Sequence, residues 1–406
     1  MKKRIIYILI IFVAVWCCTT NSIFAQTKSL SKDATISIVT ASPYAKQLVS
    51  TFGHMAIRVN DAELGIDYIF NYGVFDSNLP LLSVLHGMFQ IKLECELWVI
   101  PFEEYYSNTK SENRTIHEHV LNLSSEEKET MWKFLIEHAK GAGRLYYFDF
   151  FNENCTTYPR DLIGRVFNET LIYSKNLTFN SYRSTIHRYT EDNPWLKFTI
   201  DFITGAKIDK TAHSFYGLFT PQELEDIWMD SYIEYASEDT KALFKESVVL
   251  FERNELDENT SFRFTPLLLS LCLLALFGVF MIIELLRKKY YKSIDYVLFG
   301  FMGIVGLLFF LFKLMYSNWY FLPDWKLLWI HPFHLILVFI MWKNKPAKYL
   351  FAYHILNLTL LISLLAVFIF SIQYIDIAYL PIVLCMIIRS VHNIFMRKLY
   401  NKHQTC

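Results

Sequence analysis

The sequence carries no net charge, because 39 basic residues balance 39 acidic residues in a chain of 406. No field of one sign draws it to a nucleic acid or to an acidic surface, so we expect no nucleic-acid partner. GxxxxGK[ST], HExxH and CxxC are all missing, which gives no support to a P-loop, a zincin site or a thioredoxin-like redox site. Internal repeats and low-complexity segments are missing as well.

Cysteines are scarce where a disulfide could form. Five of the seven lie in the predicted signal, in apolar segments or at the C-terminus: Cys17, Cys18, Cys272, Cys385 and Cys406. Only Cys95 and Cys155 remain in the part that we predict to be exported. An oxidising compartment permits a disulfide between these two, so a disulfide and a pair of free thiols are both open.

Hydrophobic residues are abundant, at 53% of the chain, and the mean hydropathy is +0.24, which indicates a membrane portion. The N-terminus resembles a signal peptide over residues 1–25, with a basic start, an apolar stretch over 5–16 and a cleavage site at 23–25. An uncleaved anchor is the alternative. Lipidation at Cys17 is not expected, since Trp16 stands where such signals need a small residue.

The chain after residue 262 is predicted to be an all-α membrane domain, 263–406. About five apolar stretches approach the roughly 20 residues that a spanning helix needs. They lie near 265–286, 294–315, 325–342, 349–373 and 376–396. The third is the weakest, because Pro332 and two histidines interrupt it.

Basic residues set the expected orientation of these spans. They gather in loops near 287–292 and 343–348 and in the tail near 397–402, while the other two loops have almost no positive excess. The positive-inside rule puts the basic loops and the C-terminus in the cytoplasm of a multi-pass inner-membrane protein. Residues 26–262 then lie in the periplasm, in agreement with the signal.

The exported part is predicted to be one α+β domain. Strands are expected over 36–40, 54–59, 66–72, 93–100 and 114–123. A helix capped by Ser124 or Ser125 should run to about Lys140. Residues 146–151 should be extended, and residues 180–262 mostly helical.

One faint metal motif is present, His117-Glu118-His119. In a strand, both imidazoles would share one face, but the sequence offers no third ligand. We therefore expect a polar surface at this position and no metal.

Two segments carry residue types suited to nucleophilic catalysis: Phe52-Gly53-His54 entering a strand, and residues 152–157 entering a helix with Pro159 in its first turn. A helix start favours the thiolate of Cys155, and a nearby imidazole can hold the proton. Backbone N–H groups at the same helix start could stabilise an oxyanion.

The predicted hairpin tests whether His54 has an orienting partner. If residues 60–65 form the turn, His54 lies opposite Asn71 and Arg58 lies opposite Asp67, all on one polar face above an apolar one. Asn71 could then hold the imidazole as the third member of a triad. Asp67 is the substitute if the pairing shifts by two or more residues.

The order of these motifs, with histidine first and Asn154-Cys155 later, resembles that of circularly permuted papain-like enzymes, including the lecithin-retinol acyltransferase group. That resemblance implies a circularly permuted papain-like fold for the exported domain. Such enzymes move an acyl chain through a cysteine thioester.

A closer resemblance covers nearly the whole chain. It rests on four short motifs of the exported part and two of the membrane part: Phe52-Gly53-His54 with Arg58-Val59, Asn71-Tyr72-Gly73, Tyr147-Phe148-Asp149-Phe150 before Asn154-Cys155 and Arg160, Pro194-Trp195 with Asp201, Asn318-Trp319, and Leu328-Trp329 with Pro332. These resemble the Bacteroides-type lipoprotein N-acyltransferases (Lnb). The resemblance implies a Cys–His enzyme without a cofactor.

The reaction that this resemblance implies joins an acyl donor to a lipoprotein. The acceptor is the α-amino group of a diacylglyceryl-cysteine, and the donor is a glycerophospholipid or a lipoprotein, with transfer within one lipoprotein left open. Cys155 would be the nucleophile, His54 the base and Asn71 the third member, with Asn154, Arg160, Tyr147, Asp67 and Arg58 as supporting or substrate-binding candidates. A lipid hydrolase or cysteine peptidase with the same dyad, and a non-catalytic envelope binding protein, are the alternatives.

Overall fold

The computed structural model describes residues 29–44, 50–76, 78–167, 170–173, 180–210, 217–235, 239–254, 264–316 and 318–403. The predicted signal peptide lies outside the described residues. The chain divides into two compact units. The first comprises Met1–Thr178 with Ser214–Leu256, and the second Phe179–His213 with Asp257–Cys406.

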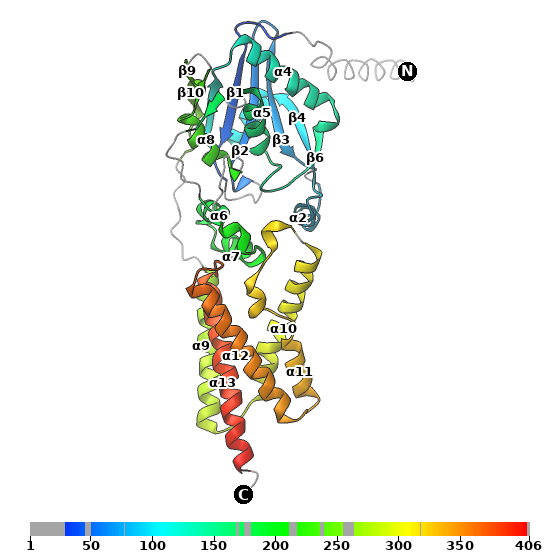
Figure 1. Cartoon of the computed structure of the whole chain (residues 1–406), viewed down its shortest axis with the longest axis vertical. Coiled ribbons are helices and arrows are strands. Elements are labelled where there is room, and N and C mark those ends of the chain that lie inside the picture. The colour runs from blue at the N-terminus through cyan, green and yellow to red at the C-terminus, as the bar shows by residue number, and fades with distance from the viewer. Residues whose placement is uncertain are drawn as a thin grey trace, which may run out of the picture. The chain divides into compact units, whose positions relative to one another are not determined.

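An antiparallel seven-stranded sheet organises the first unit, in the order β10-β5-β1-β2-β3-β4-β6 (Figure 1). Its strands are β1 Thr35–Ala41, β2 His54–Asp61, β3 Ile66–Val74, β4 Glu94–Pro101, β5 Ile116–Leu121, β6 Leu145–Tyr147 and β10 Phe244–Phe251. A small second sheet joins β7 Leu171–Ile172, β8 Tyr232–Glu234 and β9 Thr240–Ala242. The five predicted strands of the exported part are therefore all present as β1 to β5.

The expectation that residues 180–262 are mostly helical is wrong at its C-terminal end. Strand β10 pairs with β5 at the edge of the main sheet, and β8 and β9 precede it. Most side chains of β10 are exposed, so the strand lacks the alternating apolar pattern that would have predicted it. Its place in the sheet comes from backbone pairing with a distant segment.

Helices cover both faces of this sheet. The elements are α2 Leu81–Gln90, α3 Phe102–Ser111, α4 Ser125–Lys140, η2 Ala142–Arg144, α5 Thr157–Phe167 and α8 Pro221–Met229. Helix α4 begins as predicted, with a capping box between Ser124 and Glu127, and the ring of its Trp132 packs edge-on against Phe70 of β3, 6.2 Å away. Helices α4 and α5 lie over one face of the sheet (Figure 1).

The other face of the hairpin, which we predicted to be polar, is also covered. Tyr105 of α3 packs into a buried cluster with Ala56 and Ile69, which lie on the same face as His54 and Asn71. The hairpin sequence has one apolar and one mixed face. The mixed face becomes interior because helix α3 packs over it. The side chains of His54 and Asn71 are consequently partly shielded from water.

The second unit contains the membrane helices α9 Pro266–Arg287, α10 Lys292–Met315, α12 Ala347–Ile369 and α13 Leu380–His403, with α11 His334–Trp342 and the turns η6 Trp319–Phe321, η7 Trp325–Leu328 and η8 Ile377–Tyr379. Among the described residues, four helices are long and apolar enough to cross a membrane. The third predicted span is not one of them. Its helix α11 has nine residues, about 14 Å, against roughly 30 Å of hydrocarbon.

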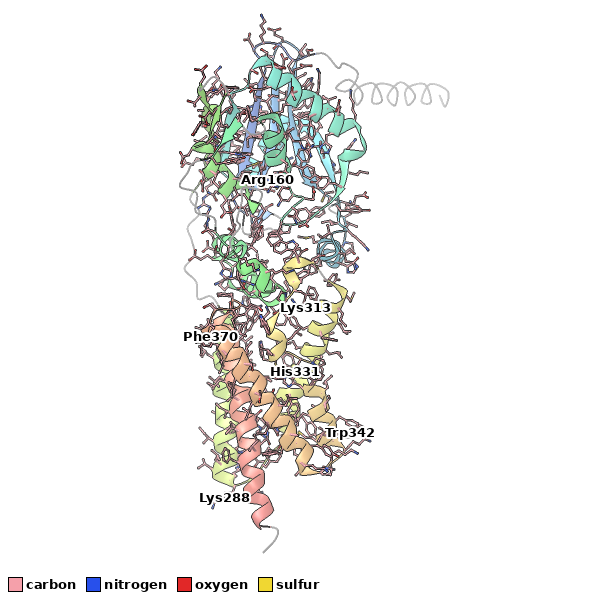
Figure 2. All side chains as sticks on the ribbon, viewed as in Figure 1. Arg160, Lys288, Lys313, His331, Trp342 and Phe370 are labelled. Atoms are coloured by element: carbon pink, nitrogen blue, oxygen red, sulfur yellow. The ribbon has the colours of Figure 1, made fainter. Side chains whose placement is uncertain are left out.

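The segment before α11 is irregular because its polar groups bond to the protein rather than continue a helix. Lys313 and Lys326 both pair with the buried carboxylate of Asp324, at 2.6 and 2.9 Å. The same two ammonium groups donate to the backbone oxygens of Ile203 and Thr204, each at 2.7 Å. These bonds join the turn region to the end of α7 Pro194–Ile203, which lies in sequence between α6 Tyr182–Thr190 and η4 Ala206–Asp209. Figure 2 labels Lys313 in this region.

Candidate active site

His54 is the first residue of β2 and follows a glycine that the local backbone requires. Gly53 has a φ of 82°, and a Cβ there would lie 3.1 Å from the carbonyl oxygen of Ala41 and 3.5 Å from Pro221. A side chain at this position would be strained and crowded. Gly53 therefore allows the chain to turn tightly into the strand that presents the imidazole.

Cys155 lies in the turn before α5, where Asn154 caps the helix. The side-chain oxygen of Asn154 accepts from the N–H groups of Thr156 and Thr157 at 2.8 and 2.9 Å, and its amide donates to the carbonyl of Phe219 at 3.0 Å. These bonds fix the turn that carries the thiol. Pro159 is in the first turn of α5, as predicted. Cys155 is half-buried and, like Cys95, has a free thiol.

His54 connects the thiol to Asn71. Its Nε2 is 2.6 Å from the side-chain oxygen of Asn71, which leaves Nδ1 to exchange a proton with Cys155. Burial alone would raise the pKa of the Cys155 thiol, but the charge and hydrogen bond of His54 outweigh burial and lower that pKa. Burial likewise opposes the imidazolium, yet Cys155 and Asn71 raise the pKa of His54. Both shifts favour a thiolate–imidazolium pair.

The hairpin register differs from the prediction by two residues. Asn60 and Asp61 continue β2 and pair with Asp67 and Ile66, so only residues 62–65 form the turn. His54 and Asn71 are therefore diagonal neighbours rather than directly opposite. A shift of two preserves the faces, so their side chains still meet.

Two supporting candidates bind each other instead of the dyad. Arg58 donates to both carboxylate oxygens of Asp67, at 2.7 and 2.9 Å, and to Glu118 at 2.9 Å. Asp67 is thus engaged by Arg58, and Asn71 is the residue that bonds His54. The guanidinium of Arg58 also lies 3.4 Å from the ring centre of Phe102 at the start of α3.

The remaining two candidates have different surroundings. Arg160 is buried and donates to Asp161 and to the carbonyl of Leu218, each at 2.7 Å, so it ties α5 to the segment before α8. Figure 2 labels Arg160 on α5. Tyr147 is 57% exposed at the end of β6.

Tyr146, which precedes Tyr147 in β6, borders the candidate site, although the sequence analysis did not single it out. Its hydroxyl is buried beside the backbone of Gly73, and within the described part of the chain it makes no hydrogen bond of good geometry. A Cβ placed on Gly73 would lie 3.6 Å from the Cβ of Cys155 and 3.9 Å from the Tyr146 hydroxyl. The glycine thus leaves a small space that thiol and phenol both border. Strand alternation could have separated Tyr146 from Tyr147 had the short strand β6 been recognised.

A groove of about 1010 Å³ opens in the first unit, and His54, Asn71 and Cys155 are not among its lining residues. Cys95 is one of its lining residues and pairs with Tyr146 across β4 and β6. Three large apolar side chains of the lining are 39 to 52% exposed: Leu79, Trp98 and Leu145. Exposed apolar side chains grouped around a groove are typical of a site for an apolar ligand.

Two family models match the chain. The model of the Lnb N-terminal periplasmic domain matches residues 24–193, and the model of the Lnb transmembrane domain matches residues 257–401. No curated protein and no solved structure matches. With the four apolar helices, these matches identify an inner-membrane protein that has a periplasmic domain.

Proposed function

The chain belongs to the Lnb family, and from this premise we propose that it is a lipoprotein N-acyltransferase with Cys155 as its nucleophile. The observation that carries the proposal is the arrangement of His54 between Asn71 and the thiol at the start of α5. The order of a histidine strand before an Asn-Cys turn also favours a circularly permuted papain-like domain.

The first half-reaction acylates the enzyme. The Cys155 thiolate attacks the carbonyl carbon of a glycerolipid ester, and a tetrahedral oxyanion forms. When that intermediate collapses, the C–O bond breaks and the His54 imidazolium gives its proton to the leaving oxygen. The products are a lyso-lipid alcohol and an acyl thioester on Cys155.

The second half-reaction transfers the chain to an amine. The α-amino nitrogen of a diacylglyceryl-cysteine attacks the thioester carbonyl, and neutral His54 accepts the proton that the nitrogen loses. The C–S bond breaks, which restores the thiolate–imidazolium pair. An ester and an amine have become an alcohol and an amide.

Two donors are available for the oxyanion. The N–H groups of Thr156 and Thr157 are occupied by the Asn154 side chain, so the N–H of Cys155 itself is the backbone donor that this turn offers to an oxyanion. The Tyr146 hydroxyl is the second, since it is buried beside the same space and lacks a well-formed bond within the described residues. Donors fixed before reaction stabilise developing charge most effectively.

Part of the groove lining suits a lipid substrate, and the lining also includes the charged residues Lys92, Glu94 and Glu96. Its exposed Leu79, Trp98 and Leu145 suit a fatty acyl chain, and its volume of about 1010 Å³ is that of a small-molecule site. The periplasmic domain of an inner-membrane protein meets lipid esters and lipoprotein precursors at the same surface. We further propose that the C-terminus is cytoplasmic.

A lipid hydrolase with the same dyad is the second candidate, because water could attack the thioester in place of the amine. The covered, apolar surroundings of His54 favour the amine. Acyl release into water without a modified acceptor would favour the hydrolase instead.

The test uses the full chain, a model diacylglyceryl lipoprotein and phospholipid, with the mass of the lipoprotein N-terminus as the readout. We expect Cys155→Ala to reduce acylation at least 10³-fold, on the order seen for lost nucleophiles, and His54→Ala by about 10²–10⁴-fold. Cys272→Ala, which removes an exposed free thiol from helix α9, is the matched control and should keep transfer. Persisting acylation in both dyad variants would exclude this mechanism, and an acyl adduct weighed on Cys155 would identify the donor.

A further inference from the structure

A second group of reactive side chains lies on the opposite face of the sheet from His54. In β1, Ala41 pairs with both His54 of β2 and Ile116 of β5, so those three side chains share one face. His117 and His119 therefore project from the other face. Glu118, between them, is buried and paired with Arg58. Glu118 and His119 are thus interior and not the polar surface that we expected, and His117 is partly exposed.

The structure supplies the third ligand that the sequence could not. Glu225, from α8, places its Oε1 2.6 Å from Nδ1 of His117 and 2.9 Å from Nε2 of His119. One ligand atom from each of the three residues lies within 4.8 Å of the others. Glu225 is more than 100 positions from the two histidines in sequence, which is why no spacing motif marks the group.

Both imidazoles direct one ring nitrogen at the same carboxylate oxygen of Glu225. The other nitrogen of His119, Nδ1, lies 2.9 Å from the Ser247 hydroxyl. In the tautomer with its hydrogen on Nδ1, His119 presents the lone pair of Nε2 toward Glu225, as a metal-bound imidazole does.

We propose that His117, His119 and Glu225 bind a divalent transition-metal ion, with Zn²⁺ as the best fit. Two imidazoles and one carboxylate are a known zinc ligand set that leaves a fourth position for water. His119 has the outer-shell partner that zinc-bound histidines have, in Ser247. His117 is partly exposed while His119 and Glu225 are mostly buried, which gives the ion an entry path from solvent.

The ion would act on the active site through α8 and not by activating the thiol. It lies on the face away from His54, so the dyad needs no metal. Helix α8 begins at Pro221, which lies against Gly53, and the preceding Phe219 accepts the hydrogen bond of Asn154. A metal that ties Glu225 to β5 would hold this helix start beneath the Cys155 turn.

Metal content of the full chain tests the proposal. The protein is purified in detergent from cells grown with zinc, dialysed against metal-free buffer, and analysed by mass spectrometry of the elements. We expect about one zinc per wild-type chain. Glu225→Gln and His119→Ala should lose it, while Glu223→Gln, the same change on the same helix, should retain it. Ser247→Ala should weaken zinc binding about 10–100-fold.

Thermal unfolding gives a second measurement of zinc binding. It uses the wild-type protein, so the result does not depend on whether a variant folds. In wild-type protein stripped by a chelator, Zn²⁺ at about 100 times its dissociation constant should raise the Tm by about 5–10 °C. Glu225→Gln should show no such shift. The proposal is overturned if wild-type protein neither retains zinc nor gains stability from it. Neither readout involves acyl transfer, so its failure would leave the proposed activity intact.

Discussion

At the scale of single residues, the site depends on which proton each of two coupled groups holds. The lowered pKa of Cys155 and the raised pKa of His54 create a range of pH in which the thiolate and the imidazolium coexist. Acyl-enzyme formation needs both, the first to attack and the second to protonate the leaving oxygen.

The rate of acyl-enzyme formation should consequently show a bell-shaped dependence on pH. It should rise as pH passes the lowered pKa of Cys155 and fall as pH passes the raised pKa of His54, where the imidazolium is lost. Since Asn71 helps to raise the pKa of His54, Asn71→Ala should move the basic limb to lower pH. Alkylation of Cys155 in a Cys95→Ala background measures the acid limb. A thiol that titrates near pH 8.5, as in a free cysteine, would contradict the pairing with His54.

Tyr146 offers a residue-scale test of the oxyanion site. Tyr146→Phe removes only the hydroxyl, so we expect acyl transfer to fall about 10²–10³-fold, as for the loss of one oxyanion donor. Single-turnover acylation of Cys155 measures it. Tyr68→Phe, on strand β3 of the same sheet, is the control and should leave the rate unchanged. A rate unchanged in Tyr146→Phe as well would leave the Cys155 N–H as the sole donor and remove Tyr146 from the mechanism.

At the scale of elements, local sequence signals predicted the helix starts of the site more accurately than they predicted how distant strands pair. Cap chemistry located α4, and the Asn154-Cys155 turn before α5 was expected because Pro159 marks a helix start. Strand pairing was less predictable, since the turn at 62–65 is shorter than its polar composition indicates. His54 and Asn71 still meet because register errors of two residues preserve the face.

What the sequence could not predict depends on contacts between distant segments. Helix α3 covers the face that holds His54, and β10 extends the sheet by pairing with β5. Tyr146 lies beside Gly73 and Cys155 because a three-residue strand aligns it with Cys95. None of these contacts follows from a periodic spacing of apolar residues in the local sequence.

Helix α5 permits an element-scale prediction through its cap. Asn154→Ala should lower the free energy of unfolding by about 0.5–2 kcal/mol, because two N–H groups lose their acceptor. It should also reduce acyl transfer, since the turn that carries Cys155 is released. Ser124→Ala removes the equivalent cap of α4 at a similar cost. Denaturant unfolding and N-terminal acylation, measured on both variants, separate the effects: equal losses of activity would mean that Asn154 acts only through stability.

At the scale of the whole molecule, the number of membrane crossings decides where the C-terminus lies. Four long helices alone would return the chain to the side on which it began. The basic loops near 287–292 and 343–348 would then lie on opposite sides, against the positive-inside rule. A fifth crossing by residues 316–342 removes this conflict. Its backbone is irregular before α11, which a membrane tolerates where protein buries it, and Trp329, Ile330 and His331 are buried.

We therefore predict five crossings, the third made by an interrupted segment and not by one long helix. Green fluorescent protein, which matures in the cytoplasm, should fluoresce when fused after residue 403, and alkaline phosphatase, which needs the periplasm, should be inactive there. Fusions after residue 254 should behave in the opposite way and serve as the control. Active phosphatase at the C-terminus would mean that residues 316–342 enter and leave the membrane on one side. The interrupted segment would then be a re-entrant loop, and the charge argument would fail for the loop near 343–348.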